Sequence, residues 1–327
     1  MTMPRGGTEI LADALFSRLP KELSDRVHIS ISVPHERPDG RPVMLWQHQS
    51  DDQPCVQPLR DPRVRENIAL FVFVSEWQKK RYIERFGIDP EKAIVIRNAI
   101  EPIPVHEKPY GPIRLVYTST PFRGLEVLLD AFELLRQKRD DVELHVYSGM
   151  SIYGAERAHE DTRFAHLYER AQHMPGVTYH GVQPNDMVRE ALKSAHIFAY
   201  PSTWEETSCL AAIEALSAGL LAVVPTLGAL PETCAPFGQL YPYTDDTQEH
   251  AMRFAAELER AVDRFWEPGT QAMLALQRTF FHRYYSWDRR IEEWKAALLP
   301  LARQAEGKRV WLEPQVAARA AHPFLLR

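Results

Sequence analysis

The chain has 327 residues, of which 45% are hydrophobic and 25% are charged. This length suits two domains. The composition is typical of a globular protein with sizeable cores, so disordered, collagen-like and coiled-coil chains are excluded. The net charge of −5 provides no excess of positive charge for a nucleic-acid partner.

Membrane spans, leader sequences and metal motifs are not evident in the sequence. No apolar run reaches the roughly 18 residues that a membrane span needs, and the first residues lack the apolar core of a signal peptide. The three cysteines, Cys55, Cys209 and Cys234, have no recognisable spacing and are expected as reduced thiols of a cytoplasmic protein. The histidines and cysteines show no metal-ligand spacing, so no structural metal is expected.

The first hundred residues alternate between helical patterns and apolar runs. A helix is expected over 8–19, with Thr8 as its N-cap. Another helix is expected after Ser75, which can cap it, and should end at Gly87. Buried strands are expected at 27–33, 42–46, 69–74 and 93–97.

The segment 101–112 contains four prolines and is predicted to be a hinge between two domains. Short strands alternating with helices predict an α/β fold with two doubly wound parallel sheets, in which ligands bind at the carboxyl ends of the strands. After the hinge, helices are expected over 125–137, 185–194, 207–218 and 248–303, with strands at 113–118, 142–147, 177–180, 196–200 and 220–224.

Two glutamates, Glu206 and Glu214, frame an otherwise small and apolar helical segment. A buried carboxylate costs several kcal/mol unless it is paired, and the vicinal diol of a ribose is a suitable partner. The amides of Thr207, Ser208 and Cys209 would lie at the positive end of the helix and could cradle a diphosphate. On spacing alone, a helix with one solvated glutamate and one capping glutamate explains the pattern equally well.

A second polar feature follows the strand at 113–118, where Arg123 and Gly124 occupy the turn before a helix. The planar fork of arginine suits a diphosphate, and glycine would let the backbone approach a ligand. By itself, an arginine beside a glycine is more often a surface residue than a ligand.

Taken in order along the chain, these pieces resemble the donor-binding domain of retaining GT-B-fold glycosyltransferases, the family 4-like members of group 1. The resemblance covers 113–235 most closely. It is carried by Arg123-Gly124-Leu125, Tyr179-His180-Gly181-Val182, Tyr200-Pro201-Ser202, the paired glutamates Glu206 and Glu214, and Leu227-Gly228-Ala229-Leu230-Pro231-Glu232.

The first half resembles the same family more weakly, through the glycine loop Arg5-Gly6-Gly7-Thr8-Glu9 and through His48 at the end of a strand. The chain begins five residues before Gly6, so a shortened N-terminal domain is expected. The expected divisions are an N-terminal acceptor-side domain over 1–105, a donor-binding domain over 106–284, a closing helix over 285–303 that packs back on the first domain, and a tail over 304–327.

The resemblance implies transfer of a hexose from a UDP-, GDP- or ADP-sugar to an acceptor hydroxyl of a glycan or glycoconjugate, as in polysaccharide biosynthesis, without a metal or other cofactor. It implies that Glu214 binds the ribose and that Arg123, in the place of the family's lysine, holds the diphosphate with the amides of 207–209. Tyr117-Thr118-Ser119 replace the family's Gly-Arg pair, so Arg123 is expected to be the main cation there. Glu206 and His48 would orient the sugar. Further donor contacts are expected from Gly6, Gly7, Ser119 and Leu210.

Two other functions fit the same residues. A nucleotide-sugar epimerase would convert the donor without an acceptor, and a non-catalytic module would bind the nucleotide sugar without releasing the sugar. The basic run Lys79-Lys80-Arg81 with Arg85 could touch anionic lipid, although a solvated helix face explains it more simply. The pair Asp51-Asp52 is expected in a solvated loop.

Overall fold

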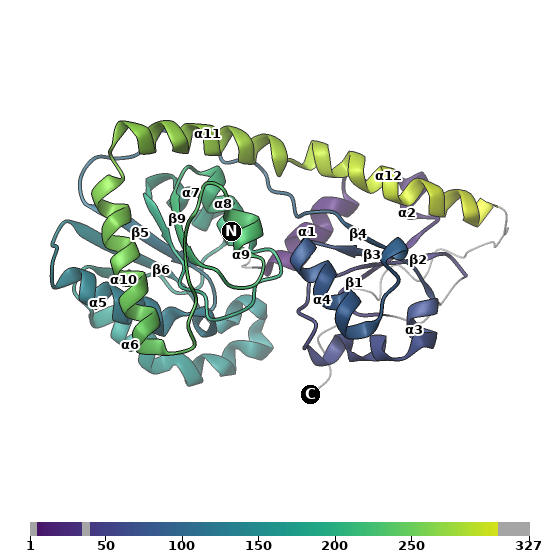
Figure 1. Ribbon diagram of the computed structural model, residues 1–327, viewed down its shortest axis with the longest axis horizontal. Coiled ribbons are helices and arrows are strands. Elements are labelled where there is room, and N and C mark those ends of the chain that lie inside the picture. The colour runs from purple at the N-terminus through teal and green to yellow at the C-terminus, as the bar shows by residue number, and fades with distance from the viewer. Residues whose placement is uncertain (1–4, 35–39, 307–327) are drawn as a thin grey trace. The chain divides into compact units, whose positions relative to one another are not determined.

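The computed structural model describes residues 5–34 and 40–306 (Figure 1). Its contacts divide the chain into two compact units. Of the described residues, unit 1 contains those up to Leu11 together with Asn98–Arg289, and unit 2 contains those of Ala12–Arg97 together with 290–306. The proline-rich segment 101–112 therefore lies within unit 1.

Unit 2 is built on a parallel sheet whose strands lie in chain order, β1-β2-β3-β4. Every residue of β2 is buried, as expected for a central strand that is covered on both faces. The predicted strands are confirmed to within a few residues. They are β1 (His28–Ile31), β2 (Val43–Trp46), β3 (Ile68–Phe73) and β4 (Ala93–Val95).

The helix that follows β3 has both of the predicted end signals. The Ser75 hydroxyl accepts a hydrogen bond of 3.0 Å from the Gln78 amide, and Gly87 ends the helix in the left-handed conformation with φ of 66°. The prediction that Thr8 caps the first helix is wrong, because that helix already begins at Gly7. The helices in or entering unit 2 are α1 (Gly7–Phe16), α2 (Lys21–Ser24), α3 (Pro62–Glu66), α4 (Glu76–Phe86) and α12 (Trp287–Glu306), with 3-10 turns η1 (Pro54–Arg60) and η2 (Pro90–Lys92).

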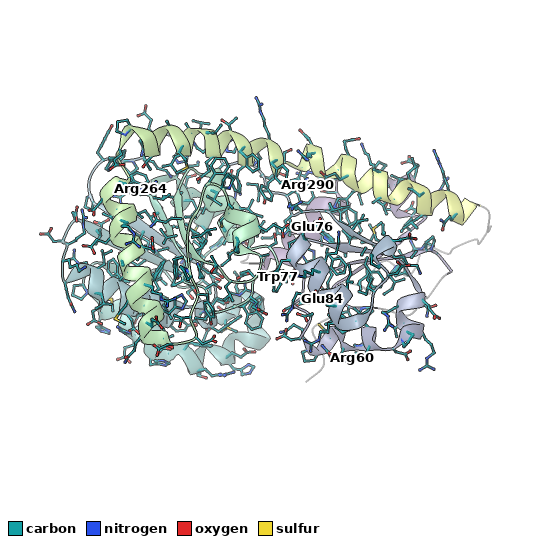
Figure 2. The ribbon with its side chains drawn as sticks, viewed as in Figure 1. Arg60, Glu76, Trp77, Glu84, Arg264 and Arg290 are labelled. Carbon is teal, nitrogen blue, oxygen red and sulfur yellow. The ribbon has the colours of Figure 1, made fainter. Side chains whose placement is uncertain are left out.

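The basic run on α4 is largely neutralised by acidic side chains of unit 2. Glu76 and Glu84, both labelled in Figure 2, pair with Lys79 at 2.9 Å and Lys80 at 3.9 Å. Arg81 and Arg85 instead reach Asp51, at 3.1 and 3.2 Å. Asp51 is buried, so the expected solvated loop is wrong for Asp51, whereas Asp52 is exposed as expected. The two arginines hold the Asp51 carboxylate, which explains why that burial is tolerated.

The C-terminal helix α12 completes the core of unit 2. The Trp294 ring meets the Trp46 ring edge to face at 4.9 Å between centroids, and Trp46 comes from the buried strand β2. Such aromatic pairs contribute about 0.5–1.5 kcal/mol beyond the area they bury.

Unit 1 contains a six-stranded parallel sheet in the order β10-β9-β8-β5-β6-β7 (Figure 1). From β5 the chain winds outward to β6 and β7, then returns to β8 on the other side of β5 and winds outward to β9 and β10. The strands are β5 (Ile113–Thr118), β6 (Val142–Tyr147), β7 (Val177–Tyr179), β8 (Ile197–Ala199), β9 (Leu221–Pro225) and β10 (Gln239–Tyr241).

This strand order creates a topological switch point between β5 and β8, where ligands bind in open α/β sheets. The helices of unit 1 are α5 (Leu125–Arg136), α6 (Ala165–His173), α7 (Asn185–Ser194), α8 (Leu210–Ser217), α9 (Leu230–Cys234), α10 (Thr247–Arg264) and α11 (Pro268–Tyr284). Three 3-10 segments join them, η3 (Pro121–Arg123), η4 (Met150–Tyr153) and η5 (Ala155–Phe164).

One helix begins later than predicted. The helix expected from Thr207 starts only at Leu210, because the backbone before it bonds to Ala229 and to Thr233 of α9. The Glu206 carbonyl accepts from the Ala229 amide at 2.8 Å, and the Ser208 carbonyl accepts from the Thr233 hydroxyl at 2.5 Å. Carbonyls used in this way are not available for a helical turn.

Candidate functional site

A buried carboxylate lies at the switch point of unit 1. The Glu206 side chain, 6% exposed, accepts hydrogen bonds on Oε1 from Arg123 Nη1 at 2.8 Å and from the Tyr200 hydroxyl at 2.5 Å. Arg123 follows β5, whereas Tyr200 and Glu206 follow β8. We call these three residues the Glu206 cluster.

The cluster satisfies the physical requirement for burying a charge. A carboxylate removed from water is strongly unfavourable unless a cation and hydrogen-bond donors compensate it, and Arg123 and Tyr200 supply both. Burial and the nearby Glu206 charge raise the pKa of Tyr200 well above its ordinary value, so its hydroxyl stays protonated and donates. Arg123 also lies 3.4 Å from the Tyr153 hydroxyl, through Nη2.

Two glycines allow the backbone segments of the cluster to approach one another. Gly228 has φ of 57°, and a Cβ added there would lie 2.7 Å from the backbone nitrogen and oxygen of Glu206. Gly124 has φ of 110°, and a Cβ there would lie 2.1 Å from the Pro201 carbonyl oxygen. Gly124 therefore allows a close approach to the loop after β8, and its expected approach to a ligand stays a prediction.

The amino end of α8 lies next to this cluster in the chain. Cys209 immediately precedes the helix in a left-handed conformation with φ of 65°, which is uncommon for any residue but glycine. The first-turn amides are therefore those of Leu210, Ala211 and Ala212, not those of 207–209. They provide the partial positive charge that favours anions at a helix start.

Glu214 lies further along α8 and has a cation as its partner. Arg189 of α7 donates to Glu214 Oε1 at 2.5 Å and to the Glu101 carbonyl at 2.7 Å. The Glu214 side chain is 21% exposed. Burial raises the pKa of Glu214, an effect that the Arg189 charge opposes. Sequence reasoning missed Arg189, since no motif marks it.

The glycine loop of the first residues belongs to unit 1. The Arg5 amide donates to the Asn185 side chain at 3.1 Å, and a Cβ added to Gly7 would lie 3.4 Å from the Leu210 side chain. Gly7 and Leu210, both predicted to contact the donor, are thus brought together. Gly6 precedes this contact, at the start of α1.

The remaining predicted residues lie in different places. The Ser119 hydroxyl is 3.4 Å from the Tyr200 hydroxyl, at the edge of the Glu206 cluster. His48 lies in unit 2, two residues after β2, with its ring 4.4 Å from the Trp46 ring. Burial lowers the pKa of His48 to about 3, so its imidazole is uncharged at neutral pH.

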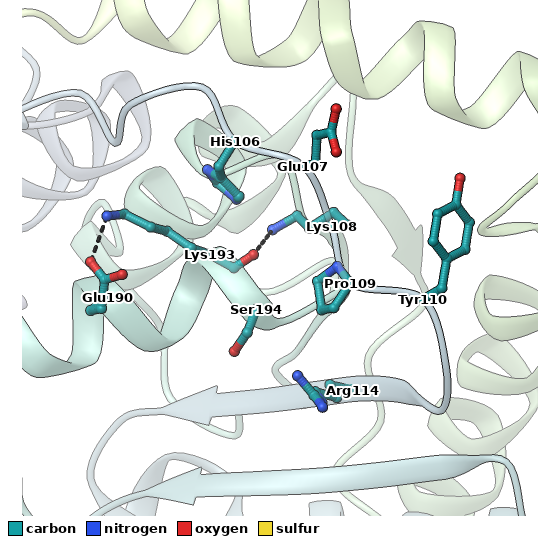
Figure 3. A pocket seen from close by; sticks show the side chains of 9 residues that line it. All are labelled: His106, Glu107, Lys108, Pro109, Tyr110, Arg114, Glu190, Lys193 and Ser194. Atoms are coloured by element: carbon teal, nitrogen blue, oxygen red, sulfur yellow. Dashed lines mark hydrogen bonds and ion pairs between the residues drawn. The ribbon is translucent and has the colours of Figure 1, made fainter.

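A separate hollow of about 490 Å³ lies at the opposite end of the unit 1 sheet, where β5 and β8 begin (Figure 3). Lys108 donates there to the Leu192 carbonyl at 3.0 Å, and burial lowers its pKa to about 7. None of the predicted site residues lines this hollow. Its lining residues are His106, Glu107, Lys108, Pro109, Tyr110, Arg114, Glu190, Lys193 and Ser194.

Residues 5–34 and 40–306 contain no group of three or more His, Cys, Asp or Glu side chains that could hold a metal ion. Among the helices in these ranges, none is both long and apolar enough to cross a membrane.

Comparison with known proteins places the Glu206 cluster in a recognised family segment. Residues 113–260 match the family model described as "Glycosyl transferases group 1". These residues belong to the group 1 glycosyltransferases. Arg123, Glu206, the start of α8 and Glu214 all fall within this group 1 segment.

Curated relatives match about half of the chain. A phosphatidylinositol N-acetylglucosaminyltransferase subunit of Arabidopsis thaliana is 27% identical over 177 residues, which is 51% of this chain and 36% of that protein. The MMP alpha-(1->4)-mannosyltransferase of Mycolicibacterium hassiacum is 27% identical over 187 residues, which is 54% of this chain and 42% of that protein. The chain thus spans well under half the length of either relative.

A solved structure resembles nearly the whole chain. A glycosyltransferase from Rickettsia africae superposes with a TM-score of 0.65 at 14% identity, covering 94% of this chain and 84% of that one. At this identity the likeness shows the fold alone. The predicted GT-B fold, built from two Rossmann-like units, is confirmed.

Proposed function

We propose that this protein is a retaining glycosyltransferase that moves a hexose from a nucleotide diphosphate sugar to an acceptor hydroxyl, a carbohydrate in a glycan or glycoconjugate. The observation that carries the proposal is the Glu206 cluster, since a buried carboxylate and an arginine meet beside a helix start at the switch point of a group 1 segment. The names of the curated relatives, an N-acetylglucosaminyltransferase and a mannosyltransferase, support a hexose unit.

The cluster can stabilise the charge that develops when the donor breaks. As the bond between the anomeric carbon and the diphosphate oxygen opens, negative charge grows on the leaving diphosphate. Arg123 and the first-turn amides of α8 supply fixed positive charge for it. Such preorganised stabilisation is usually the largest single contribution to catalysis. These groups are already in the chain, so we propose a reaction that requires no metal.

The sugar would be held by the Glu206 carboxylate, which can accept from sugar hydroxyls. His48, which is expected to orient the sugar, belongs to unit 2, and its role stays a prediction. The acceptor oxygen would bond to the anomeric carbon on the face that the diphosphate leaves. Its proton would pass to the departing phosphate oxygen. Configuration at that carbon is then retained.

The donor's ribose would lie against Glu214. A carboxylate can accept from both hydroxyls of a vicinal diol, and Glu214 remains partly exposed while it pairs with Arg189. The nucleotide base stays open among uracil, guanine and adenine.

A donor-turnover assay tests the proposal. UDP-, GDP- and ADP-sugars are incubated with and without sugar acceptors, nucleoside diphosphate release is measured, and the product anomer is identified by NMR. Acceptor-dependent release with retained configuration is expected, and Glu206→Gln should reduce it. Conversion of the donor without an acceptor would instead indicate an epimerase. Binding without release would indicate a non-catalytic module.

A further inference from the structure

Tyr200 is the second donor to the Glu206 carboxylate. It follows the last residue of β8, is fully buried, and donates to Glu206 Oε1 at 2.5 Å. A hydrogen bond to an ionised acceptor is stronger than one between neutral groups. In the sequence, Tyr200 contributes only to a family resemblance, and nothing in the pattern indicates that its hydroxyl has a role.

The Tyr200 ring has little freedom to move. It packs against the Phe198 ring at 5.3 Å and the Tyr117 ring at 5.7 Å, both from the strands that form the switch point. Its hydroxyl also lies 3.4 Å from the Ser119 hydroxyl. A donor fixed by packed rings on two strands defines the position of its acceptor.

Among the described residues, Arg123 and Tyr200 both donate to the same oxygen of the Glu206 carboxylate, Oε1. Oε2 is therefore the oxygen left to an outside donor such as a sugar hydroxyl. Arg123, however, is also the cation proposed for the diphosphate, and its guanidinium must share its donors once a ligand binds. No part of the donor is proposed to bind Tyr200 directly.

We infer that Tyr200 is a positioning residue, whose hydroxyl holds the Glu206 carboxylate toward the donor sugar while Arg123 serves the diphosphate. This inference rests on the proposed function. It assigns the two donors of the Glu206 cluster different roles, and Tyr200 acts on the sugar through Glu206. Arg123, the start of α8 and Glu214 account for the affinity for the nucleotide.

The first test is Tyr200→Phe, which removes the hydroxyl and keeps the packed ring. The expected result is a fall in kcat of about tenfold, the scale of one charge-assisted hydrogen bond. The Kd for the nucleoside diphosphate, measured by isothermal titration calorimetry, should stay within about twofold, because it depends on other groups.

Tyr117→Phe is the matched control. Tyr117 is fully buried on the adjacent strand, and its hydroxyl donates at 2.7 Å to the Thr120 carbonyl rather than to Glu206. Both variants remove one buried hydroxyl, so both report the same general cost to packing and stability. Only Tyr200→Phe should lower kcat.

The decisive measurement is a double-mutant cycle with Glu206→Ala. If Tyr200 acts through Glu206, adding Tyr200→Phe to Glu206→Ala should cause no further loss of kcat. An additive loss, an unchanged kcat in Tyr200→Phe, or a weakened nucleoside diphosphate Kd would overturn the inference.

Two further outcomes are informative. Loss of folded structure in Tyr200→Phe, measured by circular dichroism while Tyr117→Phe stays folded, would assign the hydroxyl to stability and overturn its positioning role. Absence of sugar transfer by the wild-type protein with every donor would contradict the proposed function itself. Failure of the two claims is therefore distinguishable.

Discussion

Glu206 and Arg123 depend on one another in the free protein. Neither charge is well solvated, since the Glu206 side chain is 6% exposed and the Arg123 side chain 26%. Removing one partner of such a pair leaves the other charge uncompensated, which is more costly than losing the attraction between them. A ligand that binds at this site should therefore share the donors of Arg123 with Glu206, because both charges are already compensated in the free protein.

Arg123→Ala should weaken nucleoside diphosphate binding by about 10- to 100-fold, because charge-assisted hydrogen bonds contribute about 1.5–3 kcal/mol. Isothermal titration calorimetry with UDP, GDP and ADP measures the effect. Arg170→Ala is the matched control, since Arg170 also pairs with carboxylates of unit 1, Asp130 at 2.5 Å and Glu133 at 2.7 Å. Equal affinity of both variants for the nucleoside diphosphate would show that Arg123 does not bind the diphosphate.

Glu214→Ala, which removes the acceptor oxygens, should abolish discrimination by the protein between a ribonucleotide and its 2′-deoxy analogue. The wild-type carboxylate can accept from both ribose hydroxyls, so the deoxy ligand should bind about tenfold more weakly. In the variant the ratio of the two Kd values should approach one. A wild-type protein that binds both ligands equally would show that Glu214 serves Arg189 alone.

At the scale of elements, the strands were the most predictable part of the fold. Continuous apolar runs such as 220–224 have to be buried on both faces, which specifies an internal parallel strand. The short strand β10 and the helices α6 and α9 were not predicted, because each has at most nine residues and a weak pattern. The start of α8 was misplaced because bonds to Ala229 and to Thr233 of α9, which are distant in sequence, displace the first turn.

The candidate site was only partly predictable, because its contacts also join segments that are distant in sequence. The two glutamates and Arg123 could be singled out from residue type, spacing and resemblance. Their contacts could not, since the meeting of Arg123 with Glu206 depends on β8 lying beside β5. The hydroxyl of Tyr200 and the Arg189 partner of Glu214 have no sequence signal of their own.

Gly124→Ala tests the close approach of the segments after β5 and β8. An added Cβ would lie 2.1 Å from the Pro201 carbonyl oxygen, a backbone atom that cannot easily move. The free energy of unfolding should fall by about 3 kcal/mol or more, from the left-handed backbone and the clash together. Urea unfolding followed by circular dichroism measures it.

Gly111→Ala is the control for this substitution. Gly111 also belongs to unit 1 and has φ of 125°, but an added Cβ would meet nothing within 4 Å. It should therefore lose only the backbone contribution, about 1–2 kcal/mol. Equal losses in the two variants would show that contact with Pro201 does not constrain residue 124.

At the scale of the whole molecule, buried histidines make stability depend on pH. Burial lowers the pKa of His196 and of His250 to about 4, and of His48 to about 3. The unfolded chain binds these protons near the ordinary pKa of about 6.5, before the folded chain does. Stability should therefore be fully present above that pH and fall as the pH drops from 7 to 5, by at most about 1.4 kcal/mol per pH unit for each histidine.

Urea unfolding between pH 7 and 5, above the range in which most carboxylates titrate, measures this dependence. His250→Gln should reduce the slope, because it removes one titrating group while leaving a polar partner for the Tyr241 hydroxyl, 2.8 Å away in the wild type. Stability that is constant or rises on acidification would contradict the assignment of neutral, buried imidazoles.

The central claim is that the donor binds at the switch point between β5 and β8. Hydrogen–deuterium exchange tests it most directly, with the UDP-, GDP- or ADP-sugar that gives the largest thermal shift. A ligand at 100 times its Kd stabilises the folded state by about 2.7 kcal/mol, enough to slow exchange clearly. Protection is expected at 118–124 and 200–214. Protection confined to 106–114 and 190–194, which line the hollow at the opposite end of the sheet, would contradict the account.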